Sequence, residues 1–219
     1  MKKIINAFLF VGMMFSMTAC FDITEDVTVN KDGSGVFTSI MDATKLSEQL
    51  AVYASFDTTG QMIPKMKYSL DSTFAQNFKK YRQIKGISNV KVDTSKEYVY
   101  KVTVDFKDFT ALNDVINVDK KDSKDKNIYA WEKGKVSRKD IASGLDGLGM
   151  EDESQKEMLK QILKDMKYKI IFRVPQAVKN MTNKVATLSS DKKTVTLQCN
   201  LLDVMEAKTK LGNEVKYKN

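Results

Sequence analysis

Alternation of apolar and polar residues is the feature that most limits the folds open to this chain. From Tyr98 to Phe106 an apolar or aromatic side chain stands at every second position, and from Val195 to Leu201 the same two-residue period recurs. Successive side chains of a strand point to opposite faces, so this period predicts strands with one buried and one solvated face. Such half-exposed strands are typical of antiparallel sheets.

Turn residues and helical spacings complete the predicted architecture. We expect an early hairpin over residues 27–41 that turns at Asp32-Gly33, because Asp-Gly favours positive φ. Further strands are predicted over 90–106, 168–174, 186–189, 194–201 and 214–217, and a short hairpin is predicted around residues 128–131 with its turn at Lys133-Gly134. Helices are predicted over 44–55, 70–85, 109–116, 153–166 and 202–208. Residues 57–67 are expected to form a loop, because they contain Gly60 and Pro64, and Gly86 is expected to cap the second helix.

The predicted fold class is α+β, with antiparallel β hairpins and a meander packed against three or four helices on one face. Residues 27–219 are expected to form a single α+β domain. The glycines at 144, 147 and 149 are typical of a connector and could mark a boundary between two lobes near residues 140–150.

The N-terminus has the three parts of a secretory signal peptide. Lys2 and Lys3 precede an apolar stretch over residues 4–15, and small residues lead up to Cys20. The apolar stretch is shorter than the ~20 residues that a membrane-spanning helix needs. We therefore expect residues 1–19 to be a cleaved signal peptide and residues 20–26 to be a lipidated tether.

The segment Met17-Thr-Ala-Cys20 resembles a bacterial lipobox. The resemblance implies lipidation of Cys20, with palmitate or a similar acyl chain, and membrane anchoring in the cell envelope. Phe21 resembles the residue that follows the cysteine in outer-membrane lipoproteins, and the acidic residues of Asp22–Asp26 resemble a surface-export signal of Bacteroidota lipoproteins. These resemblances imply an outer-membrane lipoprotein and leave its periplasmic or surface orientation open.

Two other segments resemble uncharacterised bacterial lipoprotein domains of the mycobacterial LppM type. One is the Asp32-Gly-Ser-Gly35 turn soon after Cys20, and the other is Phe172-Arg-Val-Pro175 followed by a hairpin turn at Ser190-Asp-Lys192. The C-terminal transmembrane helix of that type has no counterpart in this sequence. The resemblance implies an envelope protein in contact with lipid, and it transfers no catalytic residue.

Charge and cysteine content narrow the expected partners. Without residues 1–19 the chain keeps 34 basic and 28 acidic residues, a net charge of +6 spread along 200 residues. This spread is typical of a solvated surface, and no nucleic-acid-binding motif is present, so we do not expect nucleic acid as a partner. With Cys20 lipidated, Cys199 lacks a partner for an intramolecular disulfide, and its place on an apolar face predicts a buried, unreactive thiol.

The sequence contains no histidine. Histidine is the usual base of Ser-His-Asp and Cys-His catalysis and the commonest metal ligand, so we expect no metal site and no cofactor. The Asn30–Ser34 segment lacks the ordered acidic residues of an EF-hand calcium loop. A hydrolase that uses two carboxylates stays open, because 28 acidic residues allow many pairs.

Apolar residues at helical spacing form the remaining candidate for a binding site. The hypothetical hydrophobic groove is lined by Phe74, Phe78, Tyr81, Met158, Ile162 and Met166. Aromatic and methionine surfaces adapt to varied apolar ligands. The same side chains would also serve as ordinary core.

The leading hypothesis is a non-enzymatic, membrane-anchored envelope lipoprotein that binds a protein partner or another envelope component. An alternative is a lipid or small-amphiphile carrier that uses the aromatic and methionine groove. A third is a carboxylate-based hydrolase without histidine. A cavity lined by side chains such as Phe74, Phe78 and Ile162 would favour the carrier, whereas a filled core there would exclude it.

Overall fold

The computed structural model describes residues 22–45, 47–48, 60–118, 126–140, 157, 160–161 and 163–218. Within these ranges the strands are β1 (Asp22–Val29), β2 (Gly35–Asp42), β3 (Ile87–Asp93), β4 (Val99–Phe106), β5 (Tyr129–Glu132), β6 (Lys135–Arg138), β7 (Lys167–Arg173), β8 (Val178–Met181), β9 (Thr187–Leu188), β10 (Thr194–Asn200) and β11 (Asn213–Tyr217). The helices with bounds in these ranges are α3 (Met62–Tyr81), α4 (Phe109–Ile116) and α6 (Leu201–Met205). The predicted α+β class is confirmed.

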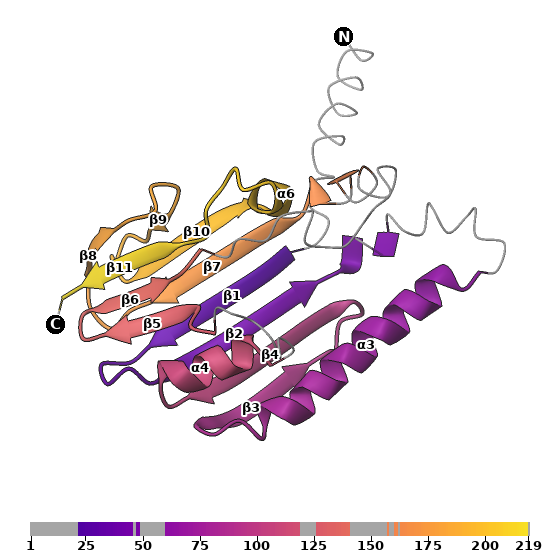
Figure 1. Ribbon diagram of the computed structural model, residues 1–219, viewed down its shortest axis with the longest axis horizontal. Coiled ribbons are helices and arrows are strands. Elements are labelled where there is room, and N and C mark those ends of the chain that lie inside the picture. The colour runs from indigo at the N-terminus through magenta and orange to yellow at the C-terminus, as the bar shows by residue number, and fades with distance from the viewer. Residues whose placement is uncertain are drawn as a thin grey trace, which may run out of the picture.

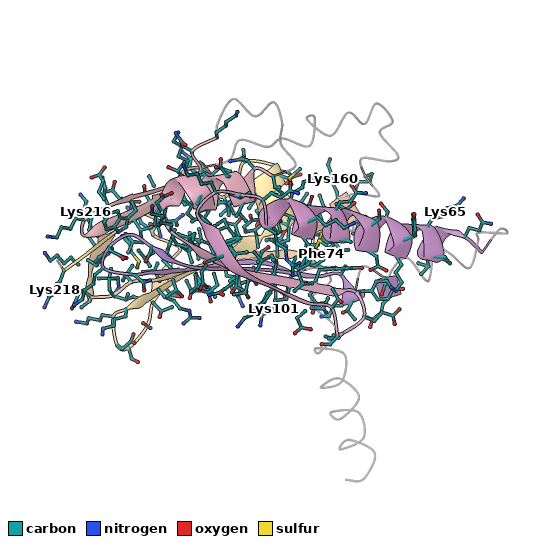
Figure 2. The ribbon with its side chains drawn as sticks, turned by 90° about the horizontal axis from the view of Figure 1, so that it is seen from below. Lys65, Phe74, Lys101, Lys160, Lys216 and Lys218 are labelled. Atoms are coloured by element: carbon teal, nitrogen blue, oxygen red, sulfur yellow. The ribbon has the colours of Figure 1, made fainter. Side chains whose placement is uncertain are left out.

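The described strands form two sheets that lie in different layers. The larger sheet has the order β3-β4-β2-β1-β7-β10-β9, and the smaller sheet has the order β5-β6-β11-β8. Figure 1 shows the smaller sheet, α3 and α4 in front of the larger sheet, and Figure 2 shows α3 and α4 along one side of it. The layer that covers the larger sheet therefore contains a second sheet as well as helices.

The core lies between the larger sheet and this second layer. Alternate side chains of the central strands, such as Val27 on β1 and Val102 on β4, are buried at 0% and 2% exposure. Tyr129 of β5 packs edge to face on Phe172 of β7, with ring centroids 5.9 Å apart. The intervening side chains point the other way, as Lys101 does in Figure 2. Full burial of one large apolar side chain contributes about 1.5–3 kcal/mol, so this alternation selects the strand register.

The β1–β2 hairpin turns at the predicted place. Gly33 has φ +85°, and the Asp32 carboxylate accepts hydrogen bonds from the Ser34 N–H and hydroxyl at 3.1 and 2.7 Å. The hairpin register pairs Asp22 with Asp42 at its open end. Asp-Gly therefore supplies both the φ and the side-chain acceptor that this turn requires.

β1 begins at Asp22, so the prediction that residues 20–26 form a tether is wrong for residues 22–26. The strand extends this far because β2 and β7 flank it on both sides and supply backbone partners along its length. Its first five residues are mostly polar, and for that reason alternation alone did not reveal them.

β1 and β7 run parallel, whereas the other strand pairs of the described ranges run antiparallel. The prediction of a purely antiparallel arrangement is therefore wrong at the centre of the larger sheet. Parallel neighbours need a long connection, and the chain between β1 and β7, which includes β2, supplies it.

α3 begins at Met62, so the predicted loop over residues 57–67 is wrong for its last six residues. Pro64 lies in the first helical turn, where the missing N–H has no intrahelical partner to lose. The helix ends at Tyr81, and Gly86 lies in the turn before β3 with φ +86° instead of capping the helix.

Several shorter elements lie where the sequence predicted them. They are the β3–β4 and β5–β6 hairpins, α4, β10 and β11. Asp108 caps α4, since its carboxylate accepts a hydrogen bond from the Ala111 N–H at 2.9 Å. β8 was not predicted, because its sequence shows no alternation.

Some predictions lie wholly or largely outside the described residues. They are the signal peptide over residues 1–19, the lipidation site Cys20, and the segments 44–55, 143–149 and 153–166. In the described part of the chain, no helix combines the length and apolar character needed to cross a membrane.

Candidate ligand-binding site

A cavity of about 360 Å³ lies between α3 and the β3–β4 hairpin, and we call it the α3–hairpin cavity. Small-molecule sites commonly have volumes of about 300–1,000 Å³. The lining residues are Lys67, Asp71, Phe74, Ala75 and Phe78 of α3, and Val92, Thr94, Lys96, Glu97, Tyr98, Val99 and Tyr100 of the hairpin. The cavity therefore combines apolar and aromatic side chains with a few charged ones.

α3 presents one stripe of its surface to the cavity. Lys67, Asp71, Phe74 and Phe78 are spaced by four, three and four residues, and this spacing keeps them on one side of a helix. Phe74 points from α3 toward the sheet, as Figure 2 shows, and its ring lies tilted against the Tyr100 ring with centroids 5.2 Å apart. The two phenylalanines and Tyr100 thus form an apolar floor.

The turn of the β3–β4 hairpin is tied to the end of β2. Tyr98 has φ +60°, a conformation that is uncommon for residues other than glycine, and its carbonyl accepts a hydrogen bond from the Ala43 N–H at 2.8 Å. The Lys96 ammonium lies 3.7 Å from a carboxylate oxygen of Asp42. These contacts position the hairpin wall of the cavity relative to the central strands.

A hydrogen-bonded cluster forms the polar side of the cavity. The Asp71 carboxylate accepts hydrogen bonds from the Lys67 ammonium at 2.7 Å and from the Tyr100 hydroxyl at 2.6 Å. These hydrogen bonds lower the pKa of Asp71, and the one to Lys67 raises the pKa of that lysine. Burial, together with Asp71, raises the pKa of Tyr100. At neutral pH the carboxylate is ionised and the phenol protonated, which suits hydrogen bonding to a ligand and not proton transfer.

The structure brings only part of the predicted groove together. Phe74 and Phe78 line the α3–hairpin cavity, whereas Tyr81 packs half-buried against the core and does not line it. Met166 is buried just before β7 and is also not a lining residue. The predicted site residues outside the described ranges are Cys20, Met158 and Ile162. The described wall that faces the two phenylalanines is the β3–β4 hairpin.

Sequence reasoning missed the polar half of this cavity. The sequence predicts a loop at Lys67, and for Tyr100 it predicts only a place on the buried face of a strand. The available signal was the four-residue spacing of Lys67 and Asp71, which is typical of an ion pair on a helix.

A second polar cluster is buried between the two sheets. Glu25 of β1 accepts hydrogen bonds from the hydroxyls of Tyr129 and Tyr168, and Arg138 Nε lies 3.1 Å from Glu25 Oε2. Burial by itself raises the pKa of Glu25, but the charge of Arg138 and the hydrogen bonds from Arg138 and both tyrosines outweigh it and hold the pKa below the ordinary 4.5. Because these groups satisfy one another, we interpret the cluster as a structural link between β1, β7 and the smaller sheet.

Metal-binding groups and the free cysteine are the remaining candidates for a reactive site. Within the described ranges, no group of three or more Asp, Glu or Cys side chains is arranged to hold a metal ion. Cys199 is half-buried, and its sulfur lies 3.7 Å from the Tyr168 carbonyl oxygen. Burial raises the pKa of Cys199 to about 11, so the thiol is protonated and weakly nucleophilic at neutral pH.

Comparison with known proteins adds little to this geometry. No protein-family model and no curated protein matches the chain. Among solved structures, the chain is similar to the folded domain of the Mycobacterium tuberculosis protein LppM, with 10% sequence identity, a TM-score of 0.43 and 92% of each chain covered. A likeness at that level establishes neither a family nor a function.

Proposed function

We propose that this protein is a membrane-anchored lipoprotein of the cell envelope, expected at the outer membrane, whose domain binds a small amphiphile without catalysing a reaction. The observation that carries the proposal is the α3–hairpin cavity, with its apolar floor of Phe74, Phe78 and Tyr100 and its polar side at Lys67 and Asp71. A concave, mostly apolar site with a few placed polar groups is the usual form of a ligand site. The anchor is the acylated Cys20 that the lipobox-like segment implies.

The charges around the cavity favour one class of amphiphile. Lys67 and Lys96 are matched by Asp71 and Glu97, so the lining charges sum to zero. A balanced rim gives no net attraction for a simple anion. The hydrogen-bonded cluster at Asp71 presents both donors and acceptors. We therefore expect a ligand with a short apolar body and an uncharged or zwitterionic head.

The state of Asp71 argues against this residue as the general acid of a hydrolase at this cavity, which Glu97 also lines. Glycoside hydrolysis by two carboxyl groups requires one of them to be a protonated acid. The lowered pKa of Asp71 keeps it ionised at neutral pH. The sequence also supports the hypothesis that the domain binds a protein partner. Failure of the amphiphile test below would favour that hypothesis.

The test compares two tryptophan variants of α3. Ala75 lines the cavity, so Ala75→Trp places an indole in the ligand volume, whereas Thr73 is exposed on the same helix and does not line it. The probe is a medium-chain lysophosphatidylcholine, titrated into the acyl-free Cys20→Ser protein and followed by calorimetry or native mass spectrometry. We expect the parent and Thr73→Trp to bind and Ala75→Trp to lose most of its affinity. Equal binding by all three, or no binding by the parent, would contradict the proposal.

The anchor is tested separately. Cys20→Ser should abolish incorporation of labelled palmitate in the native host. Labelling that persists in this variant would show that the acyl chain is attached elsewhere.

A further inference from the structure

We infer that the end of the larger sheet at which β1 begins lies against the lipid bilayer, so that the α3–hairpin cavity opens among the lipid headgroups. We call this the anchor end and define it by Asp22, Asp42 and Val99. The inference rests on the proposed acylation of Cys20. It adds the orientation of the domain and identifies the bilayer itself as the source of the ligand.

The chain between the anchor and the fold is short. Phe21 alone separates Cys20 from Asp22, the first residue of β1. Two residues span at most ~7 Å, so the Cα atom of the acylated cysteine lies within that distance of the Cα atom of Asp22. Stable anchoring holds the cysteine at the membrane surface. The domain therefore lacks the tether that would let it rotate freely away from the bilayer.

Strand register places the cavity beside the anchor. Asp22 pairs with Asp42, and Asp42 pairs with Val99, which lines the cavity. Neighbouring strands lie about 4.8 Å apart, so Val99 is roughly 10 Å from Asp22 across the sheet. Thr94, Lys96 and Glu97, which form the exposed rim of the cavity, precede Val99 in the hairpin turn at the same end.

The surface of α3 at the anchor end also suits a lipid bilayer. Figure 1 shows the N-terminal half of α3 extending beyond the anchor end, and Figure 2 shows Lys65 at one extremity of the molecule and Lys216 and Lys218 at the other. Tyr68 is 76% exposed and follows Lys67, a cavity residue. Tyrosine is enriched at membrane–water interfaces, and lysine can keep its ammonium group at headgroup level while its stem contacts apolar surface. An exposed tyrosine next to lysines therefore suits a lipid surface.

The opposite end of the sheet supplies an internal control. Gly33 lies in the β1–β2 turn, and a Cβ atom built on it would be 2.7 Å from the ring of Trp131, the single tryptophan of the chain. The length of β1 separates this turn from Asp22 by about 23 Å. Trp131 therefore reports on the end of the domain that we expect to point away from the membrane.

The experiment measures tryptophan quenching in the acylated, full-length mature protein reconstituted into phosphatidylcholine vesicles that contain headgroup-spin-labelled lipid. Tyr68→Trp places a second indole at the anchor end, at an exposed position where the substitution leaves the core untouched. We expect the emission added by Trp at position 68 to lose most of its intensity in spin-labelled vesicles, while the emission of Trp131 in the unsubstituted protein stays nearly unchanged. The Cys20→Ser, Tyr68→Trp protein in the same vesicles should show far less quenching.

The outcomes separate this inference from the proposed function. If the protein is labelled by palmitate and binds lysophosphatidylcholine but Trp at position 68 is not quenched, the orientation is overturned. The proposed function then stays intact. Stronger quenching of Trp131 than of residue 68 would place the opposite end on the membrane and would also overturn it. If the unsubstituted protein incorporates no labelled palmitate, the acylated anchor is refuted. The proposed function and the orientation both depend on that anchor. The inference is supported if Trp at position 68 is quenched, Trp131 is not, and the quenching is lost in the Cys20→Ser variant.

Discussion

Glutamine in place of Glu25 would keep the shape of the side chain and remove its negative charge from the buried cluster. The Arg138 side chain is 0% exposed, so its guanidinium would lose its counter-ion without gaining water. Its other acceptors are neutral: the Lys139 carbonyl at 3.2 Å, the Tyr129 hydroxyl at 3.3 Å and the Tyr168 hydroxyl at 3.4 Å. Breaking a buried ion pair from one side costs about 3–5 kcal/mol. The glutamine oxygen can still accept hydrogen bonds from the tyrosines, so we expect the free energy of unfolding to fall by about 3 kcal/mol, the lower end of that range.

The assay is urea and thermal unfolding of the acyl-free Cys20→Ser protein, followed by circular dichroism. In a domain of this size each kcal/mol lowers Tm by about 2–4 °C, so Glu25→Gln should lower Tm by about 6–12 °C. Adding Arg138→Met to that variant removes the unpaired charge and should recover part of the loss. A Glu25→Gln protein within about 0.5 kcal/mol of its parent would refute the reasoning, because that is the range of ordinary surface substitutions.

The pH dependence gives an independent check on Glu25. Its pKa in the folded state lies below the ordinary 4.5. The stabilisation from the ionised carboxylate is therefore complete above pH 4.5 and is lost as the pH falls through the lowered value in the folded state. The stability difference between the parent and Glu25→Gln should hold at pH 7 and shrink in acid. A difference that grows as the pH falls below 4.5 would contradict this assignment.

Two further predictions concern packing and thiol reactivity. A Cβ atom at Gly35 would lie 2.0 Å from the Thr28 carbonyl oxygen and 2.5 Å from the Phe106 ring, so Gly35→Ala should lower stability by about 1–3 kcal/mol or more, and an unchanged urea midpoint would contradict this. Because the pKa of Cys199 is raised to about 11, iodoacetamide at pH 8 should alkylate the folded acyl-free protein more than about tenfold more slowly than a free cysteine, and equal rates would show that the thiol is not shielded.

Local patterns were sufficient for most of the secondary structure. The alternation before Phe106 places Val102 and Val104 on a buried face, and the Asp32-Gly33 pair makes the first turn. These features follow from the sequence because they depend on the geometry of one strand or one turn. The two phenylalanines of the cavity were also recognisable, since helical spacing places Phe74 and Phe78 on one side of α3.

The polar components of the fold depended on partners that are remote in the sequence. Glu25 looked like part of an acidic tether, and only the arrival of Arg138, 113 residues later, makes its burial in β1 favourable. The parallel pairing of β1 with β7 likewise joins segments separated by most of the chain.

The sequence by itself determined the class of the protein: an α+β domain behind a signal-like N-terminus, with no histidine for the usual catalysis and with aromatic residues on one helix. Tertiary structure decided what those aromatic residues face, because a cavity wall is a contact between elements and has no signature within either one. The pairing of Asp22 through Asp42 with Val99 is such a contact. It places the cavity beside Asp22, two residues after the predicted anchor, a juxtaposition that strand register creates and that no local pattern encodes.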